Sequence, residues 1–389
     1  MKILFTGGGT GGHIVPIIAI TREIRRIYPS GPGPTGHRQK TDLQFFYLGP
    51  KDEFGSILLS QEGIKVREVF AGKIRRYSGW KSFLQNFVDI CLKIPIGVLQ
   101  SFFYIFFSSP DMIFCKGGFG SIPGVIAGKL LLVPVFLHES DIVPGVANQF
   151  ISRFALEIFV SFPGTEYFPL KKMILVGNPI RREVLEGSKT DGESFFKLSS
   201  AKPVVLILGG SQGAQRINDK ILEILPNLLE NFEVIHQCGE KNFEQVKAES
   251  KVMMKLPSTS TLAGGYHLFP FLKEPELRRA YAAADIICSR AGSGSIFEIA
   301  AVGKPSILIP LPESAQNHQV KNAYAYQEIG ASLVLEEANF TPHFFLEKLK
   351  SLFSQPETLI EMTKATKNFS KPEAARIIAN YLVEFLTGR

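Results

Sequence analysis

The sequence predicts an α/β protein made of two Rossmann-like domains, each with a parallel sheet, that face each other across a cleft. Near the start of the chain, a short apolar run leads into the glycine-rich residues 6–13, TGGGTGGH. A second apolar run leads into residues 209–214, GGSQGA, and then into a helix-like stretch through Asn218 to Leu229. Two such openings, about two hundred residues apart, fit two domains of ordinary size in one chain of this length.

The first glycine loop predicts a site for a phosphate or a sugar. Glycines have no β-carbon, so the backbone can approach a ligand closely, and the helix expected from about Ile14 would direct unpaired N–H groups at a bound anion. The alternative is a tight turn between strand and helix that binds nothing, and one glycine loop alone does not decide between the two. The second loop favours the binding interpretation.

Apolar runs alternate with helical patterns along the chain, as is typical of parallel α/β folds. Strands are expected in the first half at residues 2–6, 43–48, 65–70, 112–116, 133–138, 158–161 and 172–176. In the second half they are expected at 204–208, 232–237, 267–269, 286–289, 306–309 and 332–335. A turn signal near Gly177 and Pro179 predicts a first domain of residues 1–178 and a second of 179–371, with a C-terminal helix at about 372–389 packed back on the first.

The composition is that of a folded protein with an anionic partner. The chain is 45% hydrophobic and 20% charged, its formal net charge is +7, and its pI is about 9.1. Nucleic acid, anionic lipid or a phosphorylated substrate would each suit this charge, but no zinc-finger spacing or aromatic-basic motif supports nucleic acid. The four cysteines, Cys91, Cys115, Cys238 and Cys288, are far apart. They indicate reduced, mostly buried thiols in a cytoplasmic protein.

Residues 75–107 are rich in aromatic and aliphatic side chains and follow a basic cluster formed by Lys73, Arg75, Arg76 and Lys81. A membrane-spanning helix needs about twenty apolar residues, and four residues interrupt this run: Asp89, Lys93, Pro95 and Gln100. Spanning is therefore not expected. The segment is either a helix pair partly buried in the first domain or a face that enters an anionic membrane surface. Its aromatic side chains outnumber those that one helix face can bury, which favours the membrane surface.

A third cluster lies at residues 288–298, where a strand end, a loop of small residues and a helix start follow one another. This helix start offers bare N–H groups to a diphosphate. Glu298 could accept hydrogen bonds from both hydroxyls of a ribose, or it could only interact with the helix dipole. Downstream, the amides of Gln316, Asn317, Gln319 and Asn322 could bind sugar hydroxyls, or they could cap the next helix.

Seven blocks of this sequence, taken in order, resemble the MurG family of bacterial glycosyltransferases. They are residues 7–13, 116–121, 138–141, 177–181, 209–214, 290–298 and 319–323, and together they extend over nearly the whole chain. The resemblance implies a GT-B architecture, with a lipid-linked acceptor held by the first domain and UDP-N-acetylglucosamine held mainly by the second.

The activity that the resemblance implies is a step of peptidoglycan synthesis. N-acetylglucosamine would pass from its UDP donor to the 4-hydroxyl of undecaprenyl-diphosphate-linked N-acetylmuramyl pentapeptide, with inversion and a β-1,4 linkage. The enzyme would be a peripheral protein at the cytoplasmic face of the bacterial inner membrane, with an anionic membrane surface and other cell-wall enzymes as partners and no nucleic acid. Sequence reasoning finds no Asp-x-Asp pair for a divalent metal, so no metal and no cofactor are expected, and helix N-termini with Arg181 would stabilise the departing UDP.

The residues that the resemblance places around the donor are Thr10, Gly11, Gly12, Asp141, Arg181, Ser211, Leu272, Ser293, Gly294, Ser295, Glu298 and Gln319. Asp141 stands where better-known members carry Asn, and Phe119 stands where Tyr is frequent. A carboxylate beside donor phosphates repels them unless it is protonated or paired. Asp141 would therefore face the sugar hydroxyls or take part in proton transfer.

An inverting transferase needs a base for the acceptor hydroxyl, and His13 is the first choice because a neutral imidazole is available at cytoplasmic pH. Glu139 and Asp141 are its rivals, and His13 could instead only bind the loop or the acceptor's diphosphate. Three other functions remain open. They are an NAD-dependent oxidoreductase, which the lack of an acidic residue at the end of strand 43–48 disfavours, a non-catalytic membrane scaffold, and a related GT-B enzyme that glycosylates diacylglycerol.

Overall fold

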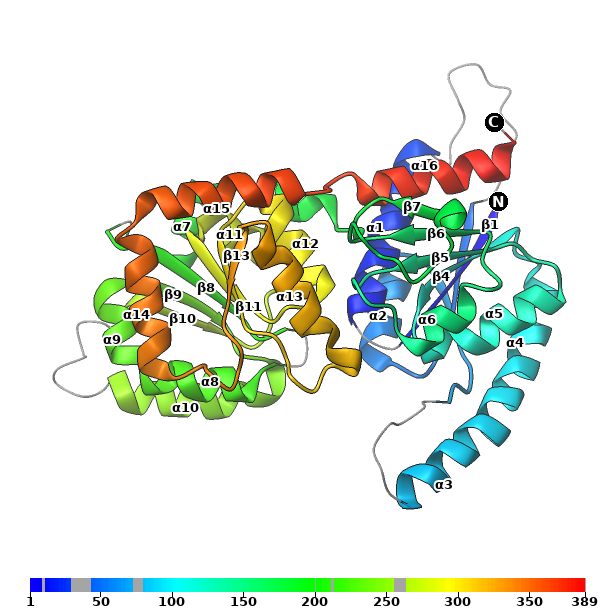
Figure 1. The fold of residues 1–389 in the computed structure, drawn as a ribbon, viewed down its shortest axis with the longest axis horizontal. Coiled ribbons are helices and arrows are strands. Elements are labelled where there is room, and N and C mark those ends of the chain that lie inside the picture. Colours follow the sequence, from blue (N-terminus) through cyan, green and yellow to red (C-terminus); the bar gives the residue numbers. More distant parts are fainter. Residues whose placement is uncertain are drawn as a thin grey trace. The chain divides into compact units, whose positions relative to one another are not determined.

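The computed structural model describes residues 1–8, 11–28, 43–72, 80–199, 201–210, 213–254 and 264–388. The chain forms two compact units (Figure 1). The first contains Met1–Arg181 together with Pro372–Arg389, and the second contains Arg182–Lys371. Each unit is a parallel β-sheet covered by helices, so each has its own hydrophobic core.

The sheet of the first unit contains seven strands within the described residues, in the order β3-β2-β1-β4-β5-β6-β7. They are β1 (Lys2–Gly7), β2 (Gln44–Gly49), β3 (Lys65–Glu68), β4 (Met112–Gly117), β5 (Val135–Glu139), β6 (Glu157–Val160) and β7 (Met173–Leu175). All pair in parallel, so their carboxyl ends lie at one edge. The strand order reverses between β1 and β4, which is where Rossmann-like sheets bind their ligands.

The helices of the first unit cover both faces of this sheet. They are α1 (Gly11–Ile27), α2 (Glu53–Gln61), α3 (Trp80–Val88), α4 (Ile94–Ser108), α5 (Ile122–Leu130), α6 (Val146–Ile151) and α16 (Ala374–Thr387). Successive side chains of a strand point to opposite faces. Accordingly, Ile3 and Phe5 pack with α1 and α16, whereas Leu4 packs with α5. Helix α16 thus supplies part of the core of the first unit through residues such as Ile378 and Leu382.

The second unit repeats this plan with six strands within the described residues, in the order β10-β9-β8-β11-β12-β13. They are β8 (Val204–Leu208), β9 (Glu233–Gln237), β10 (Tyr266–Phe269), β11 (Ile286–Ser289), β12 (Ser306–Leu308) and β13 (Ser332–Val334). Its helices are α7 (Lys189–Phe196), α8 (Gln215–Glu223), α9 (Leu225–Asn231), α10 (Phe243–Met254), α11 (Glu274–Ala283), α12 (Ser293–Val302), α13 (His318–Glu328), α14 (Pro342–Phe353) and α15 (Pro356–Phe369). Here the order reverses between β8 and β11, again beside a glycine loop.

The predicted strands are confirmed, with ends that shift by one or two residues. Two helix predictions are wrong in detail. The first helix begins at Gly11 rather than about Ile14, so His13 lies inside its first turn. The helix expected from Asn218 to Leu229 is two helices, α8 and α9. Pro226 near the start of α9 explains the break, since proline lacks the N–H that would continue the first helix.

Helices α3 and α4 are joined by a π-helical turn, Asp89–Lys93, and form one long element that runs away from the sheet (Figure 1). Asp89, Lys93 and Pro95 interrupt the apolar run, as expected, but they do not end the helix. Lys93 Nζ lies 2.6 Å from the buried carboxylate of Asp89 one turn earlier, and Pro95 occupies the start of α4, where proline is tolerated. By length and composition alone, Leu84–Ser108 would suffice to cross a membrane, and 17% of its most apolar window is buried.

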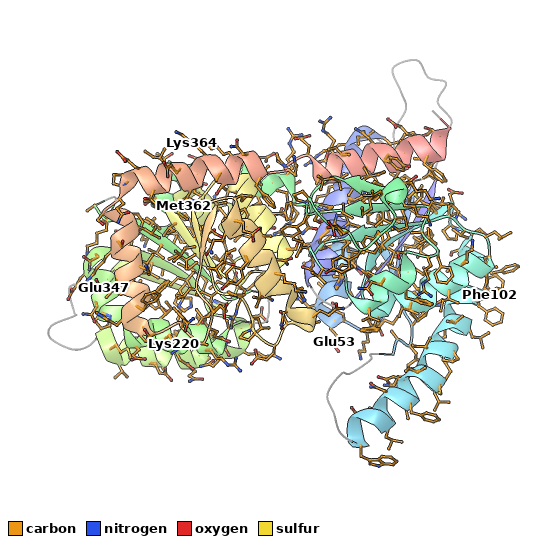
Figure 2. The ribbon with its side chains drawn as sticks, viewed as in Figure 1. Glu53, Phe102, Lys220, Glu347, Met362 and Lys364 are labelled. Carbon is orange, nitrogen blue, oxygen red and sulfur yellow. The ribbon has the colours of Figure 1, made fainter. Side chains whose placement is uncertain are left out.

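One face of α4 is packed against the first unit. Gly97, Ser101 and Ile105, spaced four residues apart, are its buried residues, and α4 lies along α5. Gly97 lies so close to the preceding segment that a β-carbon there would be 1.9 Å from the carbonyl oxygen of Phe70. Apolar side chains on the rest of the helix project outward (Figure 2); among them are Leu84, Phe87, Leu99, Phe103, Phe106 and Phe107, each more than half exposed.

Candidate active site

The glycine loops after β1 and β4 are joined at the point where the strand order of the first sheet reverses. The N–H of Gly8 donates a hydrogen bond to the carbonyl of Gly117 over 3.0 Å. The hydroxyl of Tyr47, buried at the end of β2, donates to the carbonyl of Gly7 over 3.1 Å. Hydrogen bonds between three neighbouring strand ends therefore hold them in place.

His13 lies over these two loops from the first turn of α1. A β-carbon added to Gly8 would lie 3.0 Å from His13 Cε1, and one added to Gly118 would lie 3.3 Å from His13 Nε2. The imidazole is partly exposed. Residues 8 and 118 must be small for the ring to occupy this position, so the two glycines determine where His13 can lie.

Glu139, at the end of β5, supports the second of these loops through Asn148. The carboxylate accepts a hydrogen bond from the Asn148 amide over 2.7 Å and from the Asp141 backbone N–H over 2.9 Å. Asn148 Oδ1 in turn accepts from the N–H of Gly118 over 3.0 Å. Gly117 has a φ of +90°, and a β-carbon there would lie 2.3 Å from Asn148 Oδ1. The chain of contacts runs from Glu139 through Asn148 and Gly118 to His13.

Lys116 occupies the centre of a second buried network. Its ammonium lies 2.8 Å from His138 Nδ1, donates to Ser140 Oγ, and lies 3.3 Å from Asn178 Oδ1. His138 Nε2 lies 3.0 Å from the carbonyl of Gly177. Because Nδ1 accepts from the ammonium, the ring proton belongs on Nε2, which donates to Gly177. The network joins β4, β5 and the segment that leads to Arg181.

Burial perturbs the titration of Lys116, Glu139 and His138 at this edge. It lowers the pKa of Lys116 to about 8, against the opposing influence of Glu139 and Asp141. It raises the pKa of Glu139 to about 7, and the charge of Asp141 acts in the same direction. Burial, followed by the nearby Lys116 charge, holds the pKa of His138 well below its usual range. His138 is therefore neutral near pH 7.

In the second unit, Gln237 links two strand ends next to the second glycine loop. Its amide donates to the carbonyl of Gly210 over 3.3 Å, and its Oε1 accepts from the backbone N–H of Leu272 over 2.9 Å. The side chain of Leu272 is buried. Gln237 thus fixes the segment after β10 to the loop after β8, with β9 between them.

The start of α12 and the segment after β12 belong to the same edge of the second sheet. Helix α12 begins at Ser293, immediately after the loop that follows β11, so its first N–H groups face outward from the strand ends. Glu298 is partly exposed and accepts a hydrogen bond from the hydroxyl of Tyr281 over 3.0 Å. Gln319 Oε1 accepts from the N–H of Leu311 over 3.0 Å, which ties α13 to the segment after β12.

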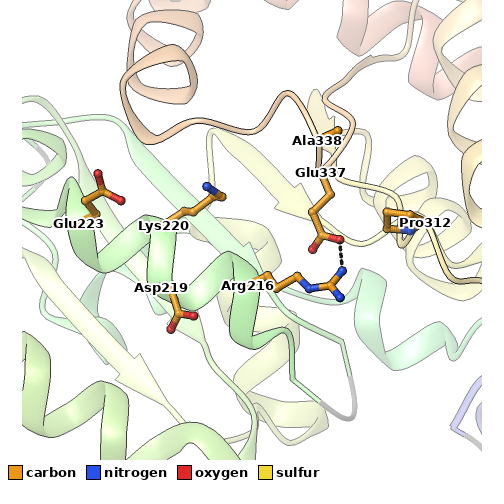
Figure 3. Close-up of a pocket in the computed structure, with 7 residues that line it drawn as sticks. All are labelled: Arg216, Asp219, Lys220, Glu223, Pro312, Glu337 and Ala338. Carbon is orange, nitrogen blue, oxygen red and sulfur yellow. Dashed lines mark hydrogen bonds and ion pairs between the residues drawn. The ribbon is translucent and has the colours of Figure 1, made fainter.

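An ion-pair network surrounds the buried carboxylate of Glu337. Arg290 Nη2 lies 2.8 Å from one oxygen, and Arg216 Nη1 lies 2.8 Å from the other. Arg290 also donates to the carbonyl of Ile309 over 3.2 Å, so the segments after β11, β12 and β13 are joined. Beside this network, an open pocket of about 510 Å³ lies between α8 and the segments after β12 and β13 (Figure 3).

The predicted site residues fall into two groups, one in each unit. Gly11, Gly12, His13, Glu139, Asp141 and Arg181 belong to the first unit, and Leu272, Ser293, Gly294, Ser295, Glu298 and Gln319 to the second. Each group lies at or next to the carboxyl edge of its own sheet. Thr10 and Ser211 lie outside the described residues.

Sequence reasoning gave no role to the polar side chains that support these groups, which are Lys116, Asn148, Asn178, Gln237 and Glu337, although Lys116 and Asn178 lie in two of the seven blocks. For Lys116 and Gln237 a signal was present, since each is a polar residue at the end of an apolar strand. The four cysteines are free, with Cys91 exposed and the others buried. Among the described residues, no three or more His, Cys, Asp or Glu side chains are grouped so that they could hold a metal ion.

Two Rossmann-like sheets, each with a glycine loop at the point where its strand order reverses, define the GT-B class of fold. Solved structures share it. The crystal structure of MurG from Acinetobacter baumannii has a TM-score of 0.71 and 23% identity, covering 98% of this chain and 99% of that one. The UDP-GlcNAc 2-epimerase from Neisseria meningitidis bound to UDP-GlcNAc has a TM-score of 0.63 and 15% identity, covering 99% and 100%.

Sequence comparison identifies the family within this class. Residues 3–160 match the N-terminal domain of glycosyltransferase family 28, and residues 204–378 match its C-terminal domain. The chain is 36% identical over 365 residues to the UDP-N-acetylglucosamine–N-acetylmuramyl-(pentapeptide) pyrophosphoryl-undecaprenol N-acetylglucosamine transferase of Clostridium tetani, covering 93% of each. It is 36% identical over 389 residues to transferase 2 of that name from Bacillus cereus, covering 98% of this chain and 99% of the relative. The chain belongs to glycosyltransferase family 28 and, within it, to the MurG transferases.

Proposed function

We propose that this enzyme transfers N-acetylglucosamine from UDP-N-acetylglucosamine to the 4-hydroxyl of undecaprenyl-diphosphate-linked N-acetylmuramyl pentapeptide. The observation that carries this proposal is the similarity, over 98% of the chain, to a Bacillus cereus transferase that is named for this reaction. The two groups of polar residues at the carboxyl edges of the two sheets give the transfer two binding surfaces. We assign the acceptor to the first domain, residues 1–178 with the helix at 372–389, and the donor mainly to the second, residues 179–371.

The donor is held by groups of the second unit and by Arg181. The first turn of α12 presents N–H groups from Ser293, Gly294 and Ser295 to the diphosphate, and its helix dipole favours this negative charge. Glu298 accepts hydrogen bonds from the ribose hydroxyls, and the Tyr281 hydroxyl orients its carboxylate. Gln319 binds sugar hydroxyls. Helix N-termini and Arg181 stabilise the departing UDP, so transfer does not require a metal.

His13 acts as the base in the first unit. As the acceptor 4-hydroxyl attacks the anomeric carbon, its proton passes to the imidazole, a new carbon–oxygen bond forms, and the bond to UDP breaks on the opposite face. This displacement inverts the anomeric centre and gives a β-1,4 linkage. The partly exposed imidazole supports this assignment over Glu139, because both Glu139 oxygens are buried and already accept hydrogen bonds.

The test is transfer of radiolabelled N-acetylglucosamine from its UDP donor to a short-chain lipid-diphosphate muramyl pentapeptide, with EDTA present and diacylglycerol as a competing acceptor. We expect labelled muramyl lipid alone. Labelled diacylglycerol would overturn the acceptor assignment, and loss of transfer on adding EDTA to folded enzyme would overturn metal independence. A folded protein that transfers to neither acceptor would contradict the proposed activity.

The exposed face of α3 and α4 supports a peripheral position on the cytoplasmic side of the inner membrane, where other cell-wall enzymes would be its partners. One face of α4 is fixed on the first unit through Gly97, Ser101 and Ile105, which leaves the opposite apolar face to enter the lipid surface. The net charge of +7 favours anionic headgroups.

Substitution of this face tests the membrane proposal. We expect Leu99→Glu with Phe103→Glu to reduce binding to phosphatidylglycerol vesicles by about tenfold or more, since two apolar side chains leave the lipid and two negative charges replace them. The matched control is Phe344→Glu on α14, an exposed aromatic in the second unit, which should bind vesicles like the unmodified enzyme. Equal binding by the double variant and the control would overturn the assignment.

A further inference from the structure

Lys116 has no part in the mechanism above, although its ammonium is enclosed in the first unit. The residue is 1% exposed, and it belongs to the strand that ends at the glycine loop facing His13. Taking an ammonium out of water is costly unless it is paired and hydrogen-bonded. Its contacts with His138, Ser140 and Asn178 satisfy its hydrogen bonds, but all three partners are uncharged at neutral pH.

The balancing charges come from the turn at the end of β5. Ser140 contacts the ammonium, and Ser140 lies between the two acidic residues, Glu139 and Asp141. The backbone of this turn is closed by the Asp141 N–H, which donates to Glu139 over 2.9 Å. The other titratable groups that face Lys116 are His138 and Cys115. Burial raises the pKa of the Cys115 thiol to about 11, so that it too is neutral.

Two acidic side chains at this edge are a difficulty for the activity proposed above. The family resemblance places Asp141 among the residues around the donor diphosphate, and like charges close together in a partly buried site repel strongly. An ammonium fixed beneath the turn removes this difficulty, because it offsets the negative charge without occupying the surface on which the substrate binds.

We propose that Lys116 is a positioning residue that offsets the charge of the Glu139–Asp141 turn from beneath and ties this turn to Gly177 and Asn178. A diphosphate can then bind beside the two carboxyl groups of the turn. The turn is also held at a fixed position relative to the segment that leads to Arg181. The expected effect on the KM for the donor rests on the proposed function. The expected effect on the pKa of Glu139 rests only on the contacts of Lys116.

A double-mutant cycle of Lys116→Met and Asp141→Asn tests the charge balance. Methionine has nearly the volume of lysine without its charge, and asparagine keeps the shape of aspartate. Lys116→Met alone should raise the KM for UDP-N-acetylglucosamine by about tenfold or more, and in the Asp141→Asn background the same substitution should change it by no more than about threefold. An equal rise of KM in both backgrounds would overturn the proposal.

The control is Lys129→Met, at an exposed position on α5, which should leave the KM unchanged. If Lys116→Met does not yield folded protein, Lys116→Gln carries the same cycle, because the amide keeps a hydrogen-bonding head group without the charge. The criterion is unchanged, so a rise of KM that is equal in both backgrounds again contradicts the charge balance.

A measurement without turnover separates this proposal from the proposed function. The pKa of the Glu139 carboxyl, followed by carbon-13 NMR in the unliganded protein, should rise in Lys116→Met, since removal of a neighbouring positive charge favours the protonated acid. An unchanged pKa would contradict the role of Lys116 even in an active enzyme. If the pKa of Glu139 rose but the unmodified protein had no transferase activity, the role of Lys116 would stand and the proposed activity would be contradicted.

Discussion

The two sheets share the same order over six strands, with a seventh strand in the first, but their carboxyl edges are held together by different chemistry. In the first unit, an ammonium, a carboxyl group and an imidazole are buried together around Lys116. In the second, the neutral amide of Gln237 joins the strand ends, and the buried ion pair of Glu337 lies beside α8. At the first edge, this buried network is linked through Asn148 and Gly118 to His13, the proposed base. At the second edge, helix N–H groups and neutral amides suit a bound nucleotide. The same scaffold thus supports two different tasks.

The largest expected effect tests whether proton transfer belongs to the first edge. His13→Ala should lower kcat by about 10²- to 10⁴-fold, since the base for the acceptor hydroxyl is lost, while the KM for the donor changes by less than about threefold. Steady-state kinetics across a pH series measures both values. His343→Ala, an exposed histidine on α14, is the control. Wild-type turnover of His13→Ala at every pH would transfer the role of base to Asp141 or Glu139.

The second edge should show the opposite kinetic pattern. Glu298→Ala should raise the KM for the donor by about 10- to 100-fold with a smaller change in kcat, because a charged hydrogen-bond acceptor for the ribose is removed. Tyr281→Phe, which removes only the hydroxyl that orients Glu298, should raise the KM by about threefold. The comparison of the two edges would fail if Glu298→Ala lowered kcat and left the KM unchanged.

The buried acid of the first edge should make stability depend on pH. The pKa of Glu139 is raised to about 7 in the folded protein from a reference value of 4.5. Its contribution to stability is therefore fully present below pH 4.5 and is lost as the pH rises through about 7. The difference in unfolding free energy between the unmodified enzyme and Glu139→Gln should fall by about 3 kcal/mol across this window. Urea unfolding at several pH values measures it, and a pH-independent difference would contradict a perturbed Glu139.

The smallest effect concerns the ion pairs of the second edge. Glu337→Gln should lower the unfolding free energy by about 1–2 kcal/mol, because Arg290 loses its buried counter-charge while the hydrogen-bonding shape is kept. Glu347→Gln, in an exposed pair with Lys350, should change it by less than about 0.5 kcal/mol. Denaturant unfolding compares the two variants, and similar losses in both would mean that burial of Glu337 adds nothing.

The sequence predicted the strands well because each parallel strand is a short apolar run that ends at a turn signal. The glycine loops and the start of α12 were predicted for the same local reason. The supporting residues were not, since Lys116 meets Asn178 across 62 positions and Glu337 meets Arg216 across 121. Such contacts depend on the strand order, which local patterns do not contain.

The long apolar helix shows a second limit of sequence reasoning. Asp89 and Lys93 interrupt the apolar run, but charged residues do not end a helix, and these two form an ion pair one turn apart. A count of charged residues does not reveal that two of them neutralise each other. The helix that results is longer and more continuous than the sequence suggested, while its small residues at Gly97 and Ser101 fix it to α5.

The packing of α16 has a consequence for how the protein is made. The core of the first unit includes Ile378 and Leu382 of α16 beside Phe136 and Phe159 of the sheet. Domains generally fold as units during synthesis, but here roughly two hundred residues separate β7 from the helix that completes the same core. The first unit therefore lacks α16 while the second unit is being synthesised, and the apolar face that α16 covers stays exposed during that time. The unit that is begun first is completed last.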